Sequence, residues 1–215
     1  DTLVTELNVL EQFNPKVPQD FKDAGIVLLG NLHPLVQNAV LEQLEVTPKL
    51  VVLDTMNFWM DIALPELIEV IQKVDVITIN DEEARQLSGE YSLRVAARKI
   101  QAMGPKYVVI KKGEHGALLF GEDQIFFAPA LPLEEVFDPT GAGDTFAGGF
   151  AGYLTKTKDI SFENMKNAIV YGSNMASFCV EKFGTERMQN LTKEEIFDRL
   201  EQFKSLTQYE MSLSK

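Results

Sequence analysis

Short apolar runs alternate with longer stretches of helical periodicity along most of the chain. Four or five consecutive apolar residues that end at a polar residue or a glycine predict buried parallel strands. Apolar positions spaced three and four residues apart predict helices that bury one face. The expected strands cover residues 26–30, 49–53, 76–79 and 107–110, and the expected helices cover residues 34–44, 65–73, 81–87, 93–103, 144–154, 162–180 and 192–206.

Three further segments complete this pattern. Residues 117–120 and 124–127 predict a hairpin around Gly121, Glu122 and Asp123, and residues 1–13 alternate roughly enough to predict a lid or edge strand. Strands that alternate with helices predict an α/β fold with a doubly wound, mostly parallel sheet flanked by helices. Ligands of such sheets bind beyond the carboxyl ends of the strands, and Asn31, Asp54, Asn80 and Lys111 all fall at predicted strand ends.

Composition narrows the class of protein. With 215 residues, 45% of them hydrophobic, we expect one domain over 1–215 with one core. A net charge of −12 argues against a nucleic-acid partner, which requires clustered Lys and Arg. The single cysteine, Cys179, precludes an intrachain disulfide and fits a reducing compartment. No apolar run is long enough for a membrane span, so we expect no membrane partner and a cytoplasmic location.

The stretch from Phe137 to Phe150 contains the strongest chemical signal. Gly141, Ala142 and Gly143 have almost no side chain, so their amides can converge on a ligand at the start of a helix. Such a helix N-terminus favours a phosphoryl group. Asp144, at the rim of the turn, can take a proton from a hydroxyl held beside that phosphate. An ordinary glycine-rich turn with a capping Asp has the same short pattern.

These fourteen residues resemble the C-terminal signature of the PfkB/ribokinase family of carbohydrate and nucleoside kinases, D-T-x-G-A-G-D in consensus, with Pro139 at a position where several residues occur. The resemblance implies a ribokinase-like fold. It also implies ATP-dependent transfer of the γ-phosphoryl group to a hydroxyl of a sugar, sugar derivative or nucleoside. Asp144 would be the general base, and the amides of Gly141, Ala142, Gly143 and Asp144 would form an anion hole.

The resemblance covers only the later part of the family pattern and begins near the end of the family's β lid. We therefore expect the chain to lack the N-terminal third of the family, with residues 1–13 as the remnant of the lid. Lid strands pair between subunits in some relatives, so a homodimer through residues 1–10 is one expectation.

Asn80 and Glu83 stand three residues apart at a strand-to-helix junction, where both can face the strand-end crevice. An amide and a carboxylate suit hydrated Mg²⁺, which binds few protein oxygens directly. A capping Asn followed by acids favoured by the helix dipole explains the same residues. The family has an N-x-x-E motif at this place that organises Mg²⁺ and phosphates, and this favours the metal.

Other segments match the family at the nucleotide. Lys111, Gly113 and Gly116 resemble its K-x-G-x-x-G segment beside the ATP phosphates and adenine, although a basic turn fits equally. The helix with Ser173 and Asn174 corresponds to one that lies against adenosine, although small residues also serve close helix packing. Asp138, Thr140 and residues 182–185 align with segments that bind a monovalent cation in several relatives, which implies a K⁺ site.

Two other classes of function stay open to comparison. A nicotinamide dehydrogenase requires G-x-G-x-x-G after an early strand, and the sequence has none. It also lacks the P-loop motif of NTPases and the short zinc motifs. A nucleotide-binding, non-catalytic relative or an inactive fragment is the second class. The intact signature residues argue against this second class, and the expected lack of the family's N-terminal third argues for it.

Overall fold

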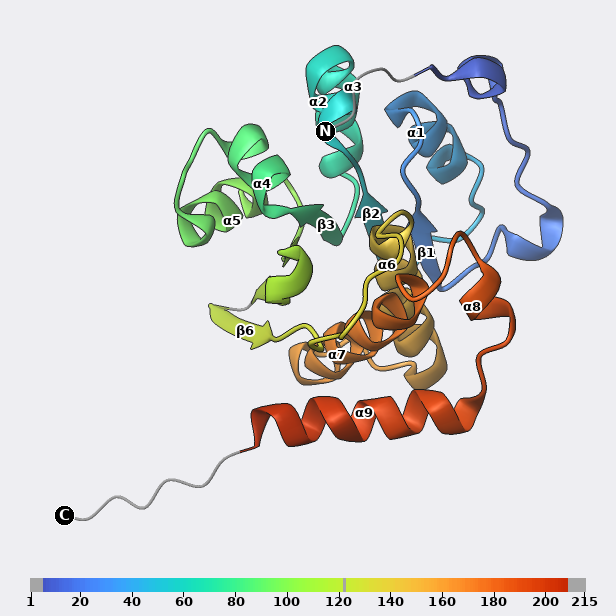
Figure 1. Cartoon of the computed structure of the whole chain (residues 1–215). Helices are drawn as coiled ribbons and strands as arrows, with labels where there is room; N and C mark the ends of the chain where they lie inside the picture. Colours follow the sequence, from blue (N-terminus) through green and yellow to red (C-terminus); the bar gives the residue numbers. More distant parts are fainter. Residues whose placement is uncertain (1–5, 122, 209–215) are drawn as a thin grey trace. The chain divides into compact units, whose positions relative to one another are not determined.

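The computed structural model describes residues 6–121 and 123–208 of the chain (Figure 1). Its six strands form one sheet in the order β1-β2-β3-β4-β5-β6. The strands are β1 (Ile26–Leu29), β2 (Leu50–Asp54), β3 (Val76–Asn80), β4 (Tyr107–Lys111), β5 (Ala117–Gly121) and β6 (Gln124–Ala128). The helices are α1 (Pro34–Glu42), α2 (Asn57–Ile62), α3 (Leu64–Ile71), α4 (Asp81–Ser88), α5 (Leu93–Gln101), α6 (Ala142–Thr157), α7 (Phe162–Cys179), α8 (Glu186–Gln189) and α9 (Lys193–Thr207).

The first three strands are parallel. β1 pairs with β2 so that Ile26 lies opposite Leu50, and β2 pairs with β3 so that Val52 lies opposite Val76. Every residue of β2 is buried, as expected of a strand with a neighbour on each side and covered faces. The α/β fold with a mostly parallel sheet flanked by helices is therefore confirmed.

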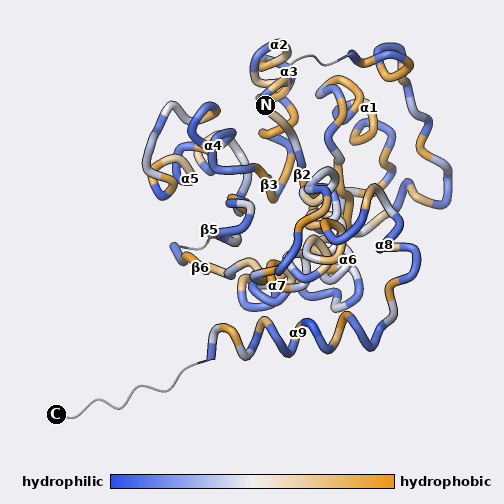
Figure 2. Tube along the Cα trace, in the orientation of Figure 1, coloured by the Kyte–Doolittle hydropathy of each residue, from blue (hydrophilic) through white to orange (hydrophobic). Residues whose placement is uncertain are grey.

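The chain divides into two compact units, which are described one at a time. Unit 1 is Asp1–Ile110 with Phe120–Gln124, and unit 2 is Lys111–Leu119 with Ile125–Lys215. In unit 1 the core is made by the central strands and by the apolar faces of α3 and α5, and Figure 2 shows the apolar colour along β3. Gly104 follows α5 with a φ of 157°, and a Cβ there would lie 2.6 Å from the carbonyl oxygen of Ile71. Only glycine fits where the chain passes the end of α3.

In unit 2, α6 packs on α7, and α9 lies along α7 (Figure 1). The first contact is unusually close: a Cβ on Gly149 would lie 3.1 Å from the Cα of Gly172. A Cβ on Gly172 would lie 2.8 Å from the carbonyl oxygen of Phe146. The two glycines let the helix backbones meet, and the buried side chains of Phe150 and Ile169 belong to the same core.

The predicted lid strand over residues 1–13 is wrong where the structure describes it. Residues Asn8–Gln12 form a 3₁₀ helix, in which the amide of Leu10 donates to the carbonyl of Leu7 at 2.9 Å. A strand needs a neighbour to satisfy its backbone groups, and this segment satisfies them locally instead. Residues 1–5 lie outside the described part, so the predicted dimer through residues 1–10 stays a prediction.

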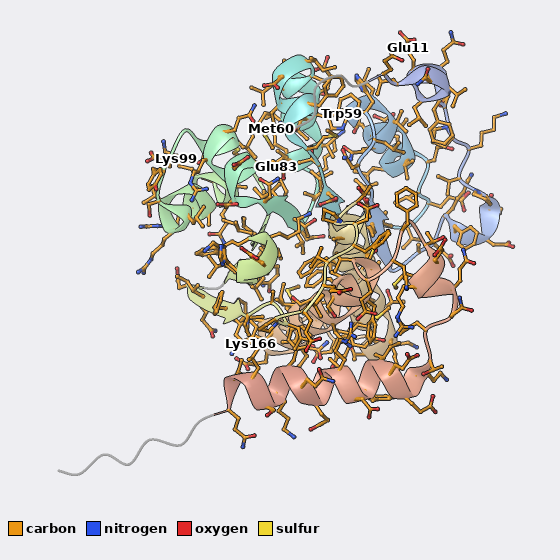
Figure 3. All side chains as sticks on the ribbon, in the orientation of Figure 1. Glu11, Trp59, Met60, Glu83, Lys99 and Lys166 are labelled. Carbon is orange, nitrogen blue, oxygen red and sulfur yellow. The ribbon has the colours of Figure 1, made fainter. Side chains whose placement is uncertain are left out.

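The sequence reading also missed α2 and α8, which are only six and four residues long. In α2, Trp59, which Figure 3 labels, is buried. Its indole N–H donates to Asn31 Oδ1 at 2.8 Å. Within residues 6–121 and 123–208, none of the helices combines the length and apolar character that crossing a membrane requires.

Candidate active site

The glycine turn begins α6 with a backbone shape that favours glycine. Gly141, the N-cap residue, has a φ of 80°, in the left-handed region that strains other residues. No side chain caps this helix. The amide of Ala142 donates to the carbonyl of Pro139 at 3.2 Å, so one of the four predicted anion-binding donors is already engaged. Gly143 and Asp144, at the second and third helical positions, have no carbonyl four residues earlier within the helix.

The segment before the turn is held by the end of α7. The amides of Phe137 and Asp138 donate to the carbonyl of Val180 at 2.8 and 3.3 Å. The buried thiol of Cys179 lies 3.8 Å from the carbonyl oxygen of Thr140, to which it donates. The approach to the glycine turn is thus fixed to α7 at three points.

Asp138 and Thr140, the predicted K⁺ ligands, form a local turn. The amide of Thr140 donates to Asp138 Oδ1 at 3.0 Å. This backbone hydrogen bond, with a second from the Thr140 side chain, lowers the pKa of Asp138 below its usual value of 3.8. Asp138 is therefore a carboxylate at neutral pH, and its second oxygen has lone pairs to offer a cation.

A cavity of about 710 Å³ opens within unit 2 beside the glycine turn. Its size is that of small-molecule sites. It brings together the predicted residues Lys111, Gly113, Gly116, Ala142, Gly143 and Ser173. The remaining wall comes from Glu114, His115 and Ala117, from residues 130–133, Val136, Pro139 and Phe146, from Ala176 and Ser177 of α7, and from Val180, which caps α7. Three segments that are far apart in the sequence therefore meet at one cavity.

The side chain of Lys111 reaches the start of α6. A Cβ on Gly143 would lie 3.3 Å from Lys111 Nζ. The ammonium group therefore lies close to a helix N-terminus, which itself has a partial positive charge. Two positive features at one cavity wall attract an anion, and the absent side chain of Gly143 leaves the backbone accessible to it.

Glycine stands at Gly113 and at Gly116 for different structural reasons. The turn that contains both glycines is closed by a hydrogen bond in which the amide of Lys112 donates to the carbonyl of Gly116 at 2.8 Å. A Cβ on Gly116 would lie 2.1 Å from the carbonyl oxygen of Ala128, so glycine is required there by the chain packed against it. At Gly113, with a φ of 54°, no described atom lies within 4 Å of the Cβ position. Packing explains Gly116, and backbone conformation alone explains Gly113.

Ser173 and Asn174 lie on different faces of α7. Ser173 lines the cavity, whereas Asn174 is 0% exposed and donates from Nδ2 to the carbonyl of Ile196 at 3.0 Å. Successive helical residues point about 100° apart, which explains the difference. The cavity residues Ala176, Ser177 and Val180 follow Ser173 at spacings of three, four and seven, a helical-face signal that could have found them.

Asp144, the predicted base, is the third residue of α6 and is exposed. It is not one of the described residues that line the cavity. A carboxylate in the first turn of a helix is stabilised by the helix dipole.

Asn80 and Glu83, in unit 1, form a reciprocal capping box at the start of α4, where Figure 3 labels Glu83. The amide of Glu83 donates to Asn80 Oδ1 at 2.8 Å, and the amide of Asn80 donates to Glu83 Oε2 at 2.7 Å. Glu83 is 7% exposed. The helix cap that explains these two residues without a metal is therefore present in the structure. An amide and a carboxylate oxygen are also the kinds of group that suit the waters of hydrated Mg²⁺. The described residues contain no cluster of three or more His, Cys, Asp or Glu side chains that could hold an ion directly.

Comparisons with known proteins identify the family. Residues 4–192 match the family model described as pfkB family carbohydrate kinase, so the chain belongs to this family. A cytidine kinase from Thermococcus kodakarensis is 35% identical over 143 residues, which are 64% of this chain and 50% of that protein. A ribokinase from Staphylococcus aureus is 33% identical over 137 residues, 61% of this chain and 43% of that protein.

A solved structure shows the same fold. Fructokinase from Vibrio cholerae, with fructose, ADP and a calcium ion bound, matches with a TM-score of 0.69 at 20% identity. The match covers 81% of this chain and 60% of that one. The chain spans about half the length of the curated relatives described above. The predicted family and ribokinase-like fold are confirmed.

Proposed function

We propose that this chain is the nucleotide-binding and catalytic part of an ATP-dependent kinase that phosphorylates a hydroxyl of a sugar, sugar derivative or nucleoside. One observation carries the proposal: a single cavity is lined by Lys111 and by the small residues that begin α6. A lysine ammonium group and helix amides together offset the charge of a transferring phosphoryl group. Membership of the pfkB family supports this chemistry.

In the proposed reaction, the carboxylate of Asp144 accepts the proton of the acceptor hydroxyl while that oxygen attacks the γ-phosphorus and ADP leaves. The amides of Gly141, Gly143 and Asp144 stabilise charge on the phosphoryl oxygens. The amide of Ala142 contributes less than the signature implied, because it already donates to Pro139. Lys111, Gly113, Gly116 and Ser173, which line the cavity, border the nucleotide, and the family signature proposes the same role for Thr140. The burial of Asn174 argues for a packing role.

Asn80 and Glu83 are the proposed holders of Mg²⁺, through its water molecules. When bound, the ion would offset phosphate charge. Asp138 and Thr140 are the proposed contributors to a K⁺ site. The fructokinase from Vibrio cholerae was solved with ADP and a divalent cation, which supports a nucleotide and a divalent metal for this chain.

The relatives support a small-molecule acceptor. A cytidine kinase and a ribokinase are among them, and they differ in whether the acceptor is a nucleoside or a free sugar. A screen of ribose, fructose, deoxyribose and the common nucleosides, with ATP and Mg²⁺ and with ADP release as the readout, tests the proposal. We expect ADP release that depends on one acceptor class, accompanied by a phosphorylated product.

The second candidate is a nucleotide-binding chain without activity of its own. It is favoured by one observation, that the chain spans about half of its curated relatives. Titration with MgATP in a calorimeter separates the two candidates. ATP binding without product from any acceptor would support this second candidate, and failure to bind ATP at all would contradict both.

A further inference from the structure

The end of α7 is held by two arginines from later helices. Glu181 lies between Arg187 of α8, whose Nε donates to Glu181 Oε2 at 2.8 Å, and Arg199 of α9, whose Nη2 donates to Glu181 Oε1. Arg187 also donates from Nη2 to Glu195 Oε1 at 2.6 Å. We call Glu181, Arg187 and Arg199 the arginine clamp.

The clamp is built on a buried ring. The guanidinium carbon of Arg199 lies 3.5 Å from the ring centroid of Phe178, and that of Arg187 lies 5.0 Å from it. Phe178 is 1% exposed, and the side chains of Arg199 and Arg187 are 15% and 19% exposed. Exposed ion pairs contribute little, but pairs that are partly desolvated and stacked on an aromatic ring are held in one geometry.

This geometry meets the cavity wall at two places. Arg199 donates from Nη1 to Ser177 Oγ at 3.1 Å, and Ser177 lines the cavity. Glu181 directly follows Val180, which also lines the cavity. The carbonyl of Val180 accepts the amides of Phe137 and Asp138, the residues that lead into the glycine turn. One peptide unit therefore connects the clamp to the segment before the proposed anion hole.

Docking of α9 does not depend on the clamp alone. Phe203 of α9 is buried, and the carbonyl of Ile196 accepts the side-chain amide of Asn174. These contacts anchor the helix independently of Arg199. The clamp is therefore not needed simply to hold α9 in place. Its contacts are with the cavity wall and the end of α7.

We propose that Arg199 and Glu181 are positioning residues for the nucleotide site. They fix Ser177 and Val180 in the cavity wall and, through the Val180 carbonyl, the approach to the glycine turn. This inference rests on the proposed function for its consequence in nucleotide binding. The guanidinium suits the task because its fork donates to Ser177 and Glu181 at once, which a lysine ammonium cannot reproduce in the same geometry.

The test compares Arg199→Met and Arg199→Lys with Lys204→Met. Lys204 is on the same helix and forms an exposed ion pair with Glu201, at 3.5 Å, so its variant controls for loss of a charge from α9. The first readout is hydrogen exchange of residues 137–144 in the 215-residue chain without ligand. We expect the amides of Phe137 and Asp138 to exchange about tenfold faster in both Arg199 variants, because coupled neighbours in a network change together.

The second readout is the dissociation constant for MgATP. We expect it to rise about tenfold in Arg199→Met and to stay within about twofold of the wild-type value in Lys204→Met. Glu181→Gln is the milder variant if Arg199→Met does not fold, since it keeps the size of the side chain and both arginines. A double variant of Arg199→Met and Glu181→Gln should lose no more than the stronger single variant.

Wild-type exchange rates at Phe137 and Asp138 in folded Arg199→Met, or in Glu181→Gln if that variant replaces it, would overturn the inference. Faster exchange without any ATP binding by the wild-type chain would leave the clamp established and contradict the proposed function instead. Faster exchange with an unchanged dissociation constant would refute the proposed effect on the nucleotide. The two proposals therefore fail in different ways.

Discussion

Two helices that begin at predicted functional turns, α4 and α6, solve the same backbone problem in opposite ways. At the start of α4, the side chains of Asn80 and Glu83 satisfy each other's amides in a closed capping box. At the start of α6, Gly141 turns the chain and no side chain caps the helix. Every helix has unpaired amides at its first turn. The capping box of α4 engages the amides of Asn80 and Glu83 with side chains, whereas at α6 the turn engages the amide of Ala142 and no side chain takes part.

The difference indicates how each turn can serve phosphate chemistry. A capped terminus presents side-chain oxygens, which suit a hydrated cation. An uncapped terminus presents amides, which suit an anion. The two short motifs, N-x-x-E and G-A-G-D, thus predict opposite ligand charges, because one supplies its own hydrogen-bond acceptors and the other has almost no side chains. The following experiments test that contrast.

Replacement of the proposed base should have the largest effect. Asp144→Asn preserves the size of the side chain but removes its ability to accept a proton. We expect kcat to fall by about 100-fold or more, with ATP affinity nearly unchanged. Steady-state kinetics with the acceptor found in the screen measures the first, and calorimetry the second. Glu201→Gln, at an exposed acid of α9, is the matched control. If Asp144→Asn kept a tenth of the wild-type rate, Asp144 would not be the base.

A methyl group added at Gly143 should weaken phosphate binding at the start of α6 without destabilising the fold. In Gly143→Ala the new methyl group lies 3.3 Å from Lys111 Nζ, whose flexible side chain must move away. We expect affinity for MgATP to fall about tenfold, the effect of losing one charged contact. The free energy of unfolding should not fall, because alanine favours helices over glycine by about 1 kcal/mol.

Gly148→Ala is the control on the same helix. Gly148 is exposed, and no described atom lies within 4 Å of its Cβ position. The substitution should raise stability to a similar extent and leave ATP affinity at its wild-type value. Equal affinities in the two alanine variants would mean that close approach to Gly143 has no part in binding.

Removal of the capping box at the start of α4 should lower the free energy of unfolding. Asn80→Ala removes the oxygen that accepts the Glu83 amide, and loss of a helix cap lowers the free energy of unfolding by about 1 kcal/mol. Asn80→Ser keeps a capping oxygen and should recover most of this loss. Urea denaturation without Mg²⁺ or nucleotide measures both variants. An alanine variant as stable as the wild type would show that the box contributes nothing.

A second capping box, formed by Thr192 and Glu195 at the start of α9, adds a small pH dependence. The hydrogen bond from Arg187, followed by that from the Thr192 amide, lowers the pKa of Glu195 from 4.5 to about 2. A lowered folded-state pKa contributes stability that is complete above about pH 4.5 and is lost as the pH falls towards about 2. Glu195→Gln should therefore be less stable than the wild type at neutral pH. The difference should shrink across that acid range in denaturation series, and a constant difference would contradict the assignment.

The sequence predicted the elements whose signals are local. The strands ending at Leu29, Asp54 and Asn80 and the long helix from Phe162 were expected to within about two residues. Buried apolar runs and helical spacing are strong signals over such lengths. The short helices α2 and α8 and the N-terminal 3₁₀ turn were missed, because their formation depends on neighbours and not on their own periodicity.

The candidate site shows the same limit. Lys111, Gly143 and Ser173 were expected at the nucleotide from the family's motifs, and the structure places all three at one cavity. The wall formed by residues 130–133 has no periodic pattern, since a loop is placed by what it packs against. The burial of Asn174 and the bond from the Ala142 amide to Pro139 required coordinates, because both depend on angles of a few tens of degrees.

The contact between Gly149 and Gly172 has a mechanical consequence. At Gly149 and Gly172 the backbones of α6 and α7 meet directly, with the side chains of Met175 and Phe146 packed against the same two glycines. If a phosphate binds at the N-terminus of α6 as proposed, a displacement of that terminus should be passed to α7, which also lines the cavity. The two helices should move together when a ligand binds. A larger residue at Gly149 or Gly172 would push them apart and weaken this coupling.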